Sequence, residues 1–316
     1  MTTSVQAHGA VGDGLTNDTS AFLAAQLADD AIVIPSGTYR LASTVDLASG
    51  KTWISEGALL IHDNDTSPIL QANGISDWAI LGHLICEGHL TTEASTGEGA
   101  LRVLSSNRGY VQRLTAKLFK GRGVEITGSS AGQYRGDALK IDSLMLAENY
   151  QGLVVAAAAG CEYSLISSVE AVGNIYPAVI HGGNTRINGG NIVDNVNGVV
   201  LGAGSNHGHG GFHGVNINHN TNYNLSASLV TNGFTFDACH FYGDGDTLGR
   251  ILLNGCQGIG IHDGIVDAAV DVSGSGRNMM SGNYIAGSKG VTGSGAASLL
   301  RTQNYNSAGL WTLNNC

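Results

Sequence analysis

The sequence predicts an all-β fold, a single-stranded parallel β-helix of about ten coils with three short strands in each. Three observations support this prediction. A nine-residue pattern recurs seven times between residues 138 and 288, and its copies begin 19 to 25 residues apart. Apolar and polar residues alternate within each copy, as they do in strands. The chain also has 47 glycines, 3 prolines and 13% charged residues, which suits neither a helical nor a disordered protein.

Each copy of the repeat supplies two strands, and its first and sixth positions are expected to point into the core. The first positions are Ile141, Ile166, Ile187, Phe212, Phe236, Ile261 and Met280, and the sixth are Leu146, Ala171, Ile192, Ile217, Phe241, Val266 and Ile285. A third strand follows at residues 152–155, 178–180, 198–201, 250–253 and 270–272. Parallel strands joined by crossovers wind in a right-handed sense, so we expect a right-handed solenoid.

The ninth position of the repeat is expected to form a column of paired side chains. It holds Asn149, Asn174, Asn195 and Asn220, and then Asp244. Stacked coils place these residues about 4.8 Å apart, at which spacing asparagine amides pair along the stack.

The solenoid needs a cover at each end, because a coil buries its apolar face only against a neighbour. Residues 1–41 are predicted to form an N-terminal cap with a short α-helix, which Thr16, Asn17 or Asp18 can cap. Its buried side is predicted to carry Ala21, Phe22, Ala25 and Leu27. Residues 42–300 form the predicted β-helix, whose early rows have Ile54, Ile80 and Val111 at the first position and Leu59 and Ile85 at the sixth. Residues 301–316 form a C-terminal cap, and the whole is one domain.

The predicted cap also carries a resemblance. The segments GAVGDGLTNDTSAF (residues 9–22) and IVIPSGTYRL (residues 32–41) resemble the N-terminal segment of the pectate-lyase-like superfamily of right-handed β-helices. That superfamily includes bacteriophage tailspikes, alginate epimerases and polysaccharide-degrading enzymes. The resemblance implies the fold and a polysaccharide as partner, but it does not choose the reaction.

Charge and composition limit the classes of molecule that this chain is expected to bind. The net charge of −10 argues against nucleic acid and against an anionic membrane surface. Five cysteines without metal-type spacing predict buried free thiols at Cys86, Cys161, Cys239 and Cys256. No signal peptide or membrane span is predicted, so we expect synthesis in a host cytoplasm and no membrane insertion. A metal in the histidine-rich segment 206–219 is the weaker interpretation, and we predict neither a metal nor a cofactor.

The candidate site lies on the outward positions of the repeat, the second, fifth and seventh. In the middle rows these positions combine amides, imidazoles, an aromatic ring and carboxylates, a mixture that suits a sugar. The predicted substrate-binding residues are His213, Asn216, Asn218, His240, Tyr242, Arg250 and His262, and the predicted catalytic carboxylates are Asp237, Asp244, Asp246 and Asp267. A purely structural alternative is open: His213, Asp237 and His262 can form a hydrogen-bond ladder, and Asp244 can continue the asparagine column.

Three functions are consistent with this patch. A glycoside hydrolase uses two carboxylates, which one or two coil spacings would place about 5 or about 9.6 Å apart. A lyase or uronate epimerase needs a base such as His262 or Tyr242 and a cation such as Arg250. A carbohydrate-binding receptor or adhesin needs no chemistry.

We predict a tailspike-like protein of the virion tail that recognises and hydrolyses a bacterial surface polysaccharide. Asp267 is the predicted member of the acid and base pair, with Asp237 or Asp246 as its partner. The chain is predicted to form a homotrimer through uncharged outer faces such as residues 154–160. If the site lies elsewhere, we expect it in a groove between subunits, near Glu125, Asp142 and Glu170.

Overall fold

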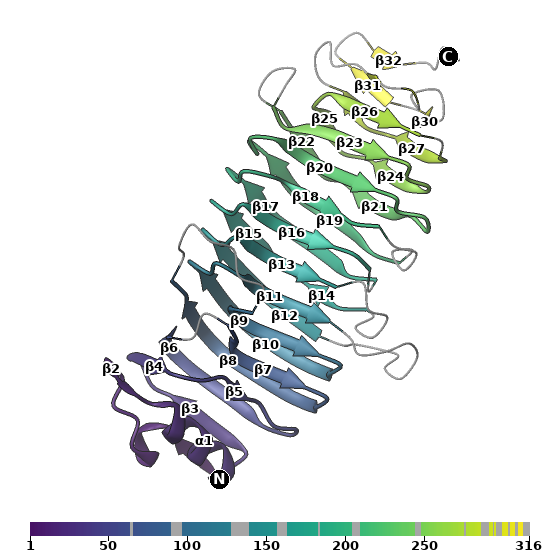
Figure 1. Cartoon of the computed structure of the whole chain (residues 1–316). Coiled ribbons are helices and arrows are strands. Elements are labelled where there is room, and N and C mark those ends of the chain that lie inside the picture. The colour runs from purple at the N-terminus through teal and green to yellow at the C-terminus, as the bar shows by residue number, and fades with distance from the viewer. Residues whose placement is uncertain are drawn as a thin grey trace.

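The chain winds into a long solenoid of about nine turns, close to the ten expected. Figure 1 shows the strands stacked from a helical cap at the N-terminus to the C-terminal end. This computed structural model describes residues 1–63, 66–89, 97–127, 139–156, 163–182, 184–203, 209–243, 248–274, 276–285, 291–292, 294, 299–302, 304–306 and 309–311. Within these residues, no helix is both long enough and apolar enough to cross a membrane.

The first of two sheets carries the first and second strands of each repeat. In the described residues its 21 strands are β1 (Thr2–Ser4), β2 (Asp13–Asn17), β3 (Ala31–Ile34), β4 (Thr38–Leu41), β6 (Thr52–His62), β8 (Ser76–Glu87), β10 (Asn107–Lys117), β12 (Leu139–Ala147), β14 (Leu165–Ile166), β15 (Val169–Val172), β17 (Arg186–Val193), β19 (Gly211–Asn218), β21 (Phe234–Asp237), β22 (His240–Tyr242), β24 (Ile259–His262), β25 (Ile265–Asp267), β27 (Asn278–Ser281), β28 (Tyr284–Ile285), β30 (Leu299–Thr302), β31 (Asn304–Asn306) and β32 (Gly309–Trp311).

The second sheet carries the third strand of each turn. In the described residues its 11 strands are β5 (Val45–Asp46), β7 (Pro68–Asn73), β9 (Gly99–Leu104), β11 (Arg122–Thr127), β13 (Gln151–Val155), β16 (Tyr176–Ile180), β18 (Val199–Leu201), β20 (Tyr223–Ser228), β23 (Arg250–Asn254), β26 (Val270–Ser273) and β29 (Val291–Thr292). The sequence analysis found five of these strands in the region of the seven repeats but missed β20. Strands pair in parallel with the next turn, as Phe212 does with Phe236, whereas β31 and β32 pair antiparallel.

The core consists of the first and sixth positions of the repeat, as predicted. Every one of these fourteen side chains is at most 8% exposed. Phe212 and Phe236 stack one turn apart with ring centroids 5.4 Å apart, and Phe241 meets Phe236 edge-on at 5.5 Å. Burying each such side chain contributes about 1.5 to 3 kcal/mol to folding.

The predicted asparagine column lies in the buried corner between the two sheets. The amide nitrogen of Asn149 donates to Asn174 at 2.9 Å, that of Asn174 to Asn195 at 3.0 Å, and that of Asn195 to Asn220 at 3.0 Å. Asn220 then donates to Asn224 at 2.9 Å. Asp244, predicted to continue the column, lies outside the described residues. The column provides hydrogen-bond partners to backbone groups that the turn leaves without strand pairing.

Two early rows differ from the predicted pattern: the first is one residue out of phase from its start, and in the second a bulge precedes the sixth position. Trp53 and Leu60 are buried where Ile54 and Leu59 were predicted, and Cys86 is buried in place of Ile85. The register shifts by one residue between β6, β8 and β10. An extra residue in a strand reverses the facing of every later side chain. Ile80 and Val111 are core residues, as predicted.

The helix α1 (Thr19–Ala28) covers the first coil, and a short 3-10 helix, η1 (Gln6–His8), precedes it. Phe22 stacks on Trp53 of the coil below at 5.8 Å. Leu27, predicted on the buried side, is 87% exposed, and Gln26 is buried instead. The amide of Gln26 binds the backbone of Asp46 and Ala48, which ties the helix to the coil.

Asp18 and Asn17, at the start of the helix, bind different parts of the backbone. Asp18 occupies the N-cap position, but its carboxylate accepts from the amides of Val11 and Gly12 in the preceding turn. Asn17 accepts from the amide of Thr19 at 3.1 Å and so serves the first turn of the helix.

The thiols of Cys86, Cys239 and Cys256 are free and buried, and Cys161 lies outside the described residues. Burial raises the pKa of the Cys239 thiol to about 11. Such a thiol is a poor nucleophile near neutral pH.

Candidate functional site

One outward column of the first sheet determines where its face is hollow. This column holds the residue that precedes the first position of each repeat. In register it reads Lys140, Leu165, Arg186, Gly211, Thr235, Gly260 and Met279. Gly211 and Gly260 each line a hollow on this face. A Cβ atom added at Gly211 would lie 2.7 Å from the backbone oxygen of Thr235, and one added at Gly260 would lie 2.4 Å from Nε2 of His262.

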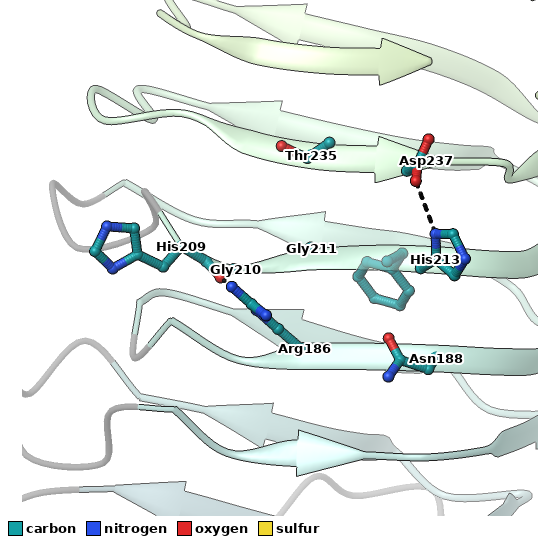
Figure 2. A pocket seen from close by; sticks show the side chains of 9 residues that line it. Arg186, Asn188, His209, Gly210, Gly211, His213, Thr235 and Asp237 are labelled. Atoms are coloured by element: carbon teal, nitrogen blue, oxygen red, sulfur yellow. Dashed lines mark hydrogen bonds and ion pairs between the residues drawn. The ribbon is translucent and has the colours of Figure 1, made fainter. Parts of the chain in front are cut away.

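The gap at Gly211 is a hollow of about 400 Å³, which we call the Gly211 hollow. Its polar lining comes from β17, β19 and β21 and from the turn before β19. The lining side chains and glycines are Arg186, Asn188, His209, Gly210, Gly211, Phe212, His213, Thr235 and Asp237. Figure 2 shows Arg186 and Thr235 on either side of Gly211, with His213 and Asp237 beside them.

A histidine and a carboxylate face each other at one side of this hollow. Nδ1 of His213 lies 2.8 Å from Oδ2 of Asp237, one strand away (Figure 2). The two side chains are 62% and 42% exposed. When the imidazole is neutral, donation from Nδ1 to the carboxylate leaves the lone pair on Nε2, where it can accept a proton.

Arg186 supplies positive charge to the same hollow. Its Nε donates to the backbone oxygen of His209 at 3.2 Å, and no carboxylate of the described residues pairs with its guanidinium. The His209 ring stacks on Tyr163 with centroids 5.9 Å apart, and the Tyr163 hydroxyl lies 3.2 Å from its Nδ1. His209 lines the hollow, whereas Tyr163 does not. The guanidinium of Arg186 can bind a planar anion in a bidentate manner.

The gap at Gly260 is a second hollow of about 350 Å³, the Gly260 hollow. Its lining residues are Thr235, Gly258, Ile259, Gly260, His262, Arg277, Asn278 and Met279. Nδ1 of His262 lies 2.7 Å from the hydroxyl of Ser281. Its Nε2 lies over Gly260, because a Cβ atom added there would be 2.4 Å from it.

The sequence matches no family model and no curated protein. Solved structures do match. The A-module of the mannuronan C-5 epimerase AlgE4 from Azotobacter vinelandii superimposes with a TM-score of 0.73 and 14% identity, over 96% of this chain and 95% of that one. The chain is a right-handed parallel β-helix. The resemblance seen in its first 41 residues is therefore confirmed at the level of the fold.

Two further structures have the same fold. The family 28 exopolygalacturonase of Yersinia enterocolitica has a TM-score of 0.56 and 11% identity, over 97% of this β-helix and 78% of the enzyme. The pre-mature gene product 12 of bacteriophage phi29 has a TM-score of 0.62 and 15% identity, over 96% of this β-helix. The β-helix spans 52% of that phage protein, about half of its length.

The predicted site residues that lie on the first sheet divide among three places. His213 and Asp237 line the Gly211 hollow, and His262 lines the Gly260 hollow. Their column is in the predicted register. Asn216, Asn218, His240, Tyr242 and Asp267 are also in the predicted columns, but on the second strands, where they line neither hollow.

Several second-strand residues have structural partners. Asn216 donates to Asn191 at 2.9 Å, and Asn191 donates to Glu170 at 2.9 Å, which forms an exposed polar ladder. Tyr242 meets His219 and His240 edge-on, with centroids 5.3 and 6.4 Å apart.

Arg250, predicted beside the patch, lies in β23 on the other sheet and pairs with Asp271. The carboxylates Asp244 and Asp246 lie outside the described residues. The predicted pair of Asp267 with Asp237 separates here, since only Asp237 lines a hollow.

The carboxylates of the alternative groove also have partners. Glu125 is paired with Arg102 at 2.7 Å and with Arg122, and it is 7% exposed. Asp142 accepts from the hydroxyl of Tyr110 and pairs with Lys140 at 3.1 Å. These contacts hold the pKa of the Asp142 carboxyl below its usual range, with the tyrosine as the main cause.

The sequence analysis missed Arg186, Asn188 and Thr235, and it considered His209 only within the histidine-rich segment 206–219 as a metal ligand. Asn188 stood in the outward second column but was not selected. Arg186 and Thr235 stand one position before the repeat, where alternation also points outward. In that column Thr235 has Gly211 on one side and Gly260 on the other, and these two glycines are the sequence feature that could have indicated a hollow. Among the described residues, no three His, Cys, Asp or Glu side chains gather as metal ligands.

Proposed function

We propose that this chain recognises a carboxylate-bearing polysaccharide on a bacterial surface and cleaves it at the Gly211 hollow, in the manner of a phage tailspike. The observation that carries the proposal is that three groups line one exposed hollow. His213 and Asp237 form a hydrogen-bonded pair, and Arg186 lies across Gly211 without a carboxylate partner in the described residues.

The three groups suit eliminative cleavage of a uronate. Arg186 pairs with the sugar carboxylate and so stabilises the negative charge that develops when C5 loses its proton. Nε2 of His213 takes that proton, while Asp237 stabilises the imidazolium that forms. The C4–O bond then breaks, the leaving oxygen acquires a proton, and the new chain end carries a C4–C5 double bond.

Hydrolysis, which the sequence predicted, needs a second carboxylate at the bond that is cleaved. The described lining of the Gly211 hollow contributes one, Asp237, and that one is held by His213. For this reason elimination is the better supported reaction. The fold neighbours support a polysaccharide as the substrate: one is a mannuronan epimerase and another an exopolygalacturonase.

The test is incubation with capsular, O-antigen and uronate polysaccharides, followed by product analysis. Elimination yields shortened chains with ultraviolet absorbance from the new double bond, and His213→Gln and Asp237→Asn lower its rate at least about a hundredfold. Asp263→Asn, an exposed carboxylate one turn on that lines neither hollow, is the control and keeps full activity. Shortened chains without that absorbance would indicate hydrolysis, and binding without shortening would indicate a receptor; either result contradicts the proposed reaction.

Location on a virion tail and a trimeric state belong to the same proposal. The phage gene product 12 among the fold neighbours supports the first. For the second, Val154 and Val155 of the predicted contact segment are 3% and 0% exposed within one chain, so a contact must use other positions. Light scattering at three times the monomer mass of 32.5 kDa is expected, and a monomer mass would contradict the trimer.

A further inference from the structure

The two hollows repeat the same chemistry along the solenoid. The Gly211 hollow has Arg186 and His213, and the Gly260 hollow has Arg277 and His262. Arg277 is exposed, and no carboxylate of the described residues pairs with it. In both histidines Nδ1 is held by a side chain of the next strand, Asp237 or Ser281. In both hollows a glycine of the outward column is part of the lining.

The spacing of the hollows follows from the strand register. Gly211 pairs with Thr235, and Thr235 pairs with Gly260. Two strand spacings separate the glycines, which amounts to about 9.6 Å along the solenoid axis. That distance is close to the length of a disaccharide, so rings at positions one and three of a bound chain would reach the two hollows. The ring between them would lie over Thr235, which offers a neutral hydroxyl.

We propose that the Gly260 hollow is a second carboxylate-binding subsite, which reads the sugar two rings from the one held in the Gly211 hollow. Arg277 binds the carboxylate of that third ring, Nε2 of His262 binds its hydroxyls, and Met279 packs against its apolar edge. The polysaccharide then runs across the strands, and recognition repeats with every second ring. This inference rests on the proposed function and extends it to the substrate class, a chain with carboxylates at least on alternate rings.

The two hollows differ in one respect that assigns their roles. His213 faces a carboxylate, whereas His262 faces a hydroxyl. A neutral partner stabilises an imidazolium less than an anionic one does, so proton abstraction is favoured at His213. The Gly260 hollow therefore contributes affinity and register, and the chemistry stays at the Gly211 hollow.

The experiment measures affinity against chain length. Oligogalacturonates and oligomannuronates of one to four rings are titrated by calorimetry into the His213→Gln protein, so that no chain is cut during the measurement. In at least one series the trimer binds about tenfold more tightly than the dimer, because it is the shortest chain that reaches both hollows. Arg277→Ala removes that step, so that the trimer binds no more tightly than the dimer. Gly260→Thr places its Cβ where Nε2 of His262 lies, so it displaces that imidazole and removes the step as well.

Arg113→Ala is the matched control, because Arg113 is an exposed arginine on the same sheet that lines neither hollow. It keeps the step at the trimer. A smooth increase of affinity with length, a step that survives in Arg277→Ala, or no binding of either series would overturn the subsite. A cleavage assay with the unmutated protein distinguishes the two proposals. Cleavage together with no step in affinity at the trimer refutes the subsite alone, and absence of cleavage refutes the proposed function.

Discussion

Replacing Asn195 by alanine tests the asparagine column that holds the corner of the solenoid. Its side chain makes five hydrogen bonds: its amide nitrogen donates to Ala171, Val193 and Asn220 at 3.1, 2.9 and 3.0 Å, and its oxygen accepts from the backbone and side-chain amides of Asn174 at 2.9 and 3.0 Å. Asn195 is 2% exposed and Asn174 0%, so water cannot replace these partners.

The cost follows from the groups that lose their partners. The buried backbone N–H of Asn174 is left without an acceptor, which costs about 1 to 3 kcal/mol. The carbonyl of Ala171 and the amides of two column neighbours lose further bonds worth about 0.5 to 1.5 kcal/mol each, partly recovered by relaxation. We expect the free energy of unfolding to fall by about 3 to 4 kcal/mol, a large loss for one substitution.

Urea unfolding followed by far-ultraviolet circular dichroism measures this loss as a lower midpoint at unchanged slope. Asn216→Ala is the control, since Asn216 is exposed and donates one bond, to Asn191 at 2.9 Å. Its expected cost is below about 0.5 kcal/mol. Equal costs for the two variants would refute the reasoning, because burial of the column would then contribute nothing.

Three other changes test separate parts of the account. Asp267→Asn keeps full cleavage activity, since Asp267 lines neither hollow, and a large loss of turnover would return Asp267 to the catalytic pair that the sequence predicted. Burial lowers the pKa of His181, so as pH falls the unfolded chain takes up a proton there before the folded chain does, and stability falls below about pH 6.5. The urea midpoints at pH 7 and pH 5 should therefore lie closer together in His181→Gln than in the unmutated protein, and an unchanged difference would contradict this. Gly82→Ala places a Cβ 2.0 Å from the backbone oxygen of Ser55 at a φ of 76°, whereas the Cβ of Gly57→Ala meets nothing within 4 Å at a φ of 85°. Urea unfolding should show a loss of stability of about 1 to 2 kcal/mol for Gly57→Ala and clearly more for Gly82→Ala, and equal losses would count against the bulge geometry.

The regular part of the fold could be predicted because the repeat reports core positions directly. Phe212, Phe236 and Ile261 each start a row at the same phase, and all three are buried against the next turn. The pattern fails at Ile85, because a bulge before it changes the phase without changing the composition. It fails at Ile54, which precedes the bulge, because Trp53 and Ile54 are both apolar and hydrophobicity does not choose between them. Leu27 fails for a different reason: the polar side chain of Gln26 is buried by the backbone groups that it binds, which hydrophobicity does not report.

The site could be predicted only in part, because register is recoverable from sequence and shape is not. Alternation placed His213, Asp237 and His262 in one outward column, and strand pairing confirms it. Alternation does not say which residues of that face border a hollow. Tyr242 and Asp267 have suitable chemistry, yet they line neither hollow.

Absence of a side chain shapes this surface as much as presence of one. On a flat parallel sheet each outward residue has neighbours about 4.8 Å away on both sides, so a continuous column of side chains leaves no concavity. Gly211 opens a gap one residue wide, but the gap becomes chemically specific only because Arg186 precedes it and His213 lies two positions further along the same strand. Gly260 opens the next gap with Arg277 and His262 at its border. Each hollow therefore combines a glycine of the outward column with an arginine and a histidine, and all three are outward residues that leave the core and the asparagine column unchanged.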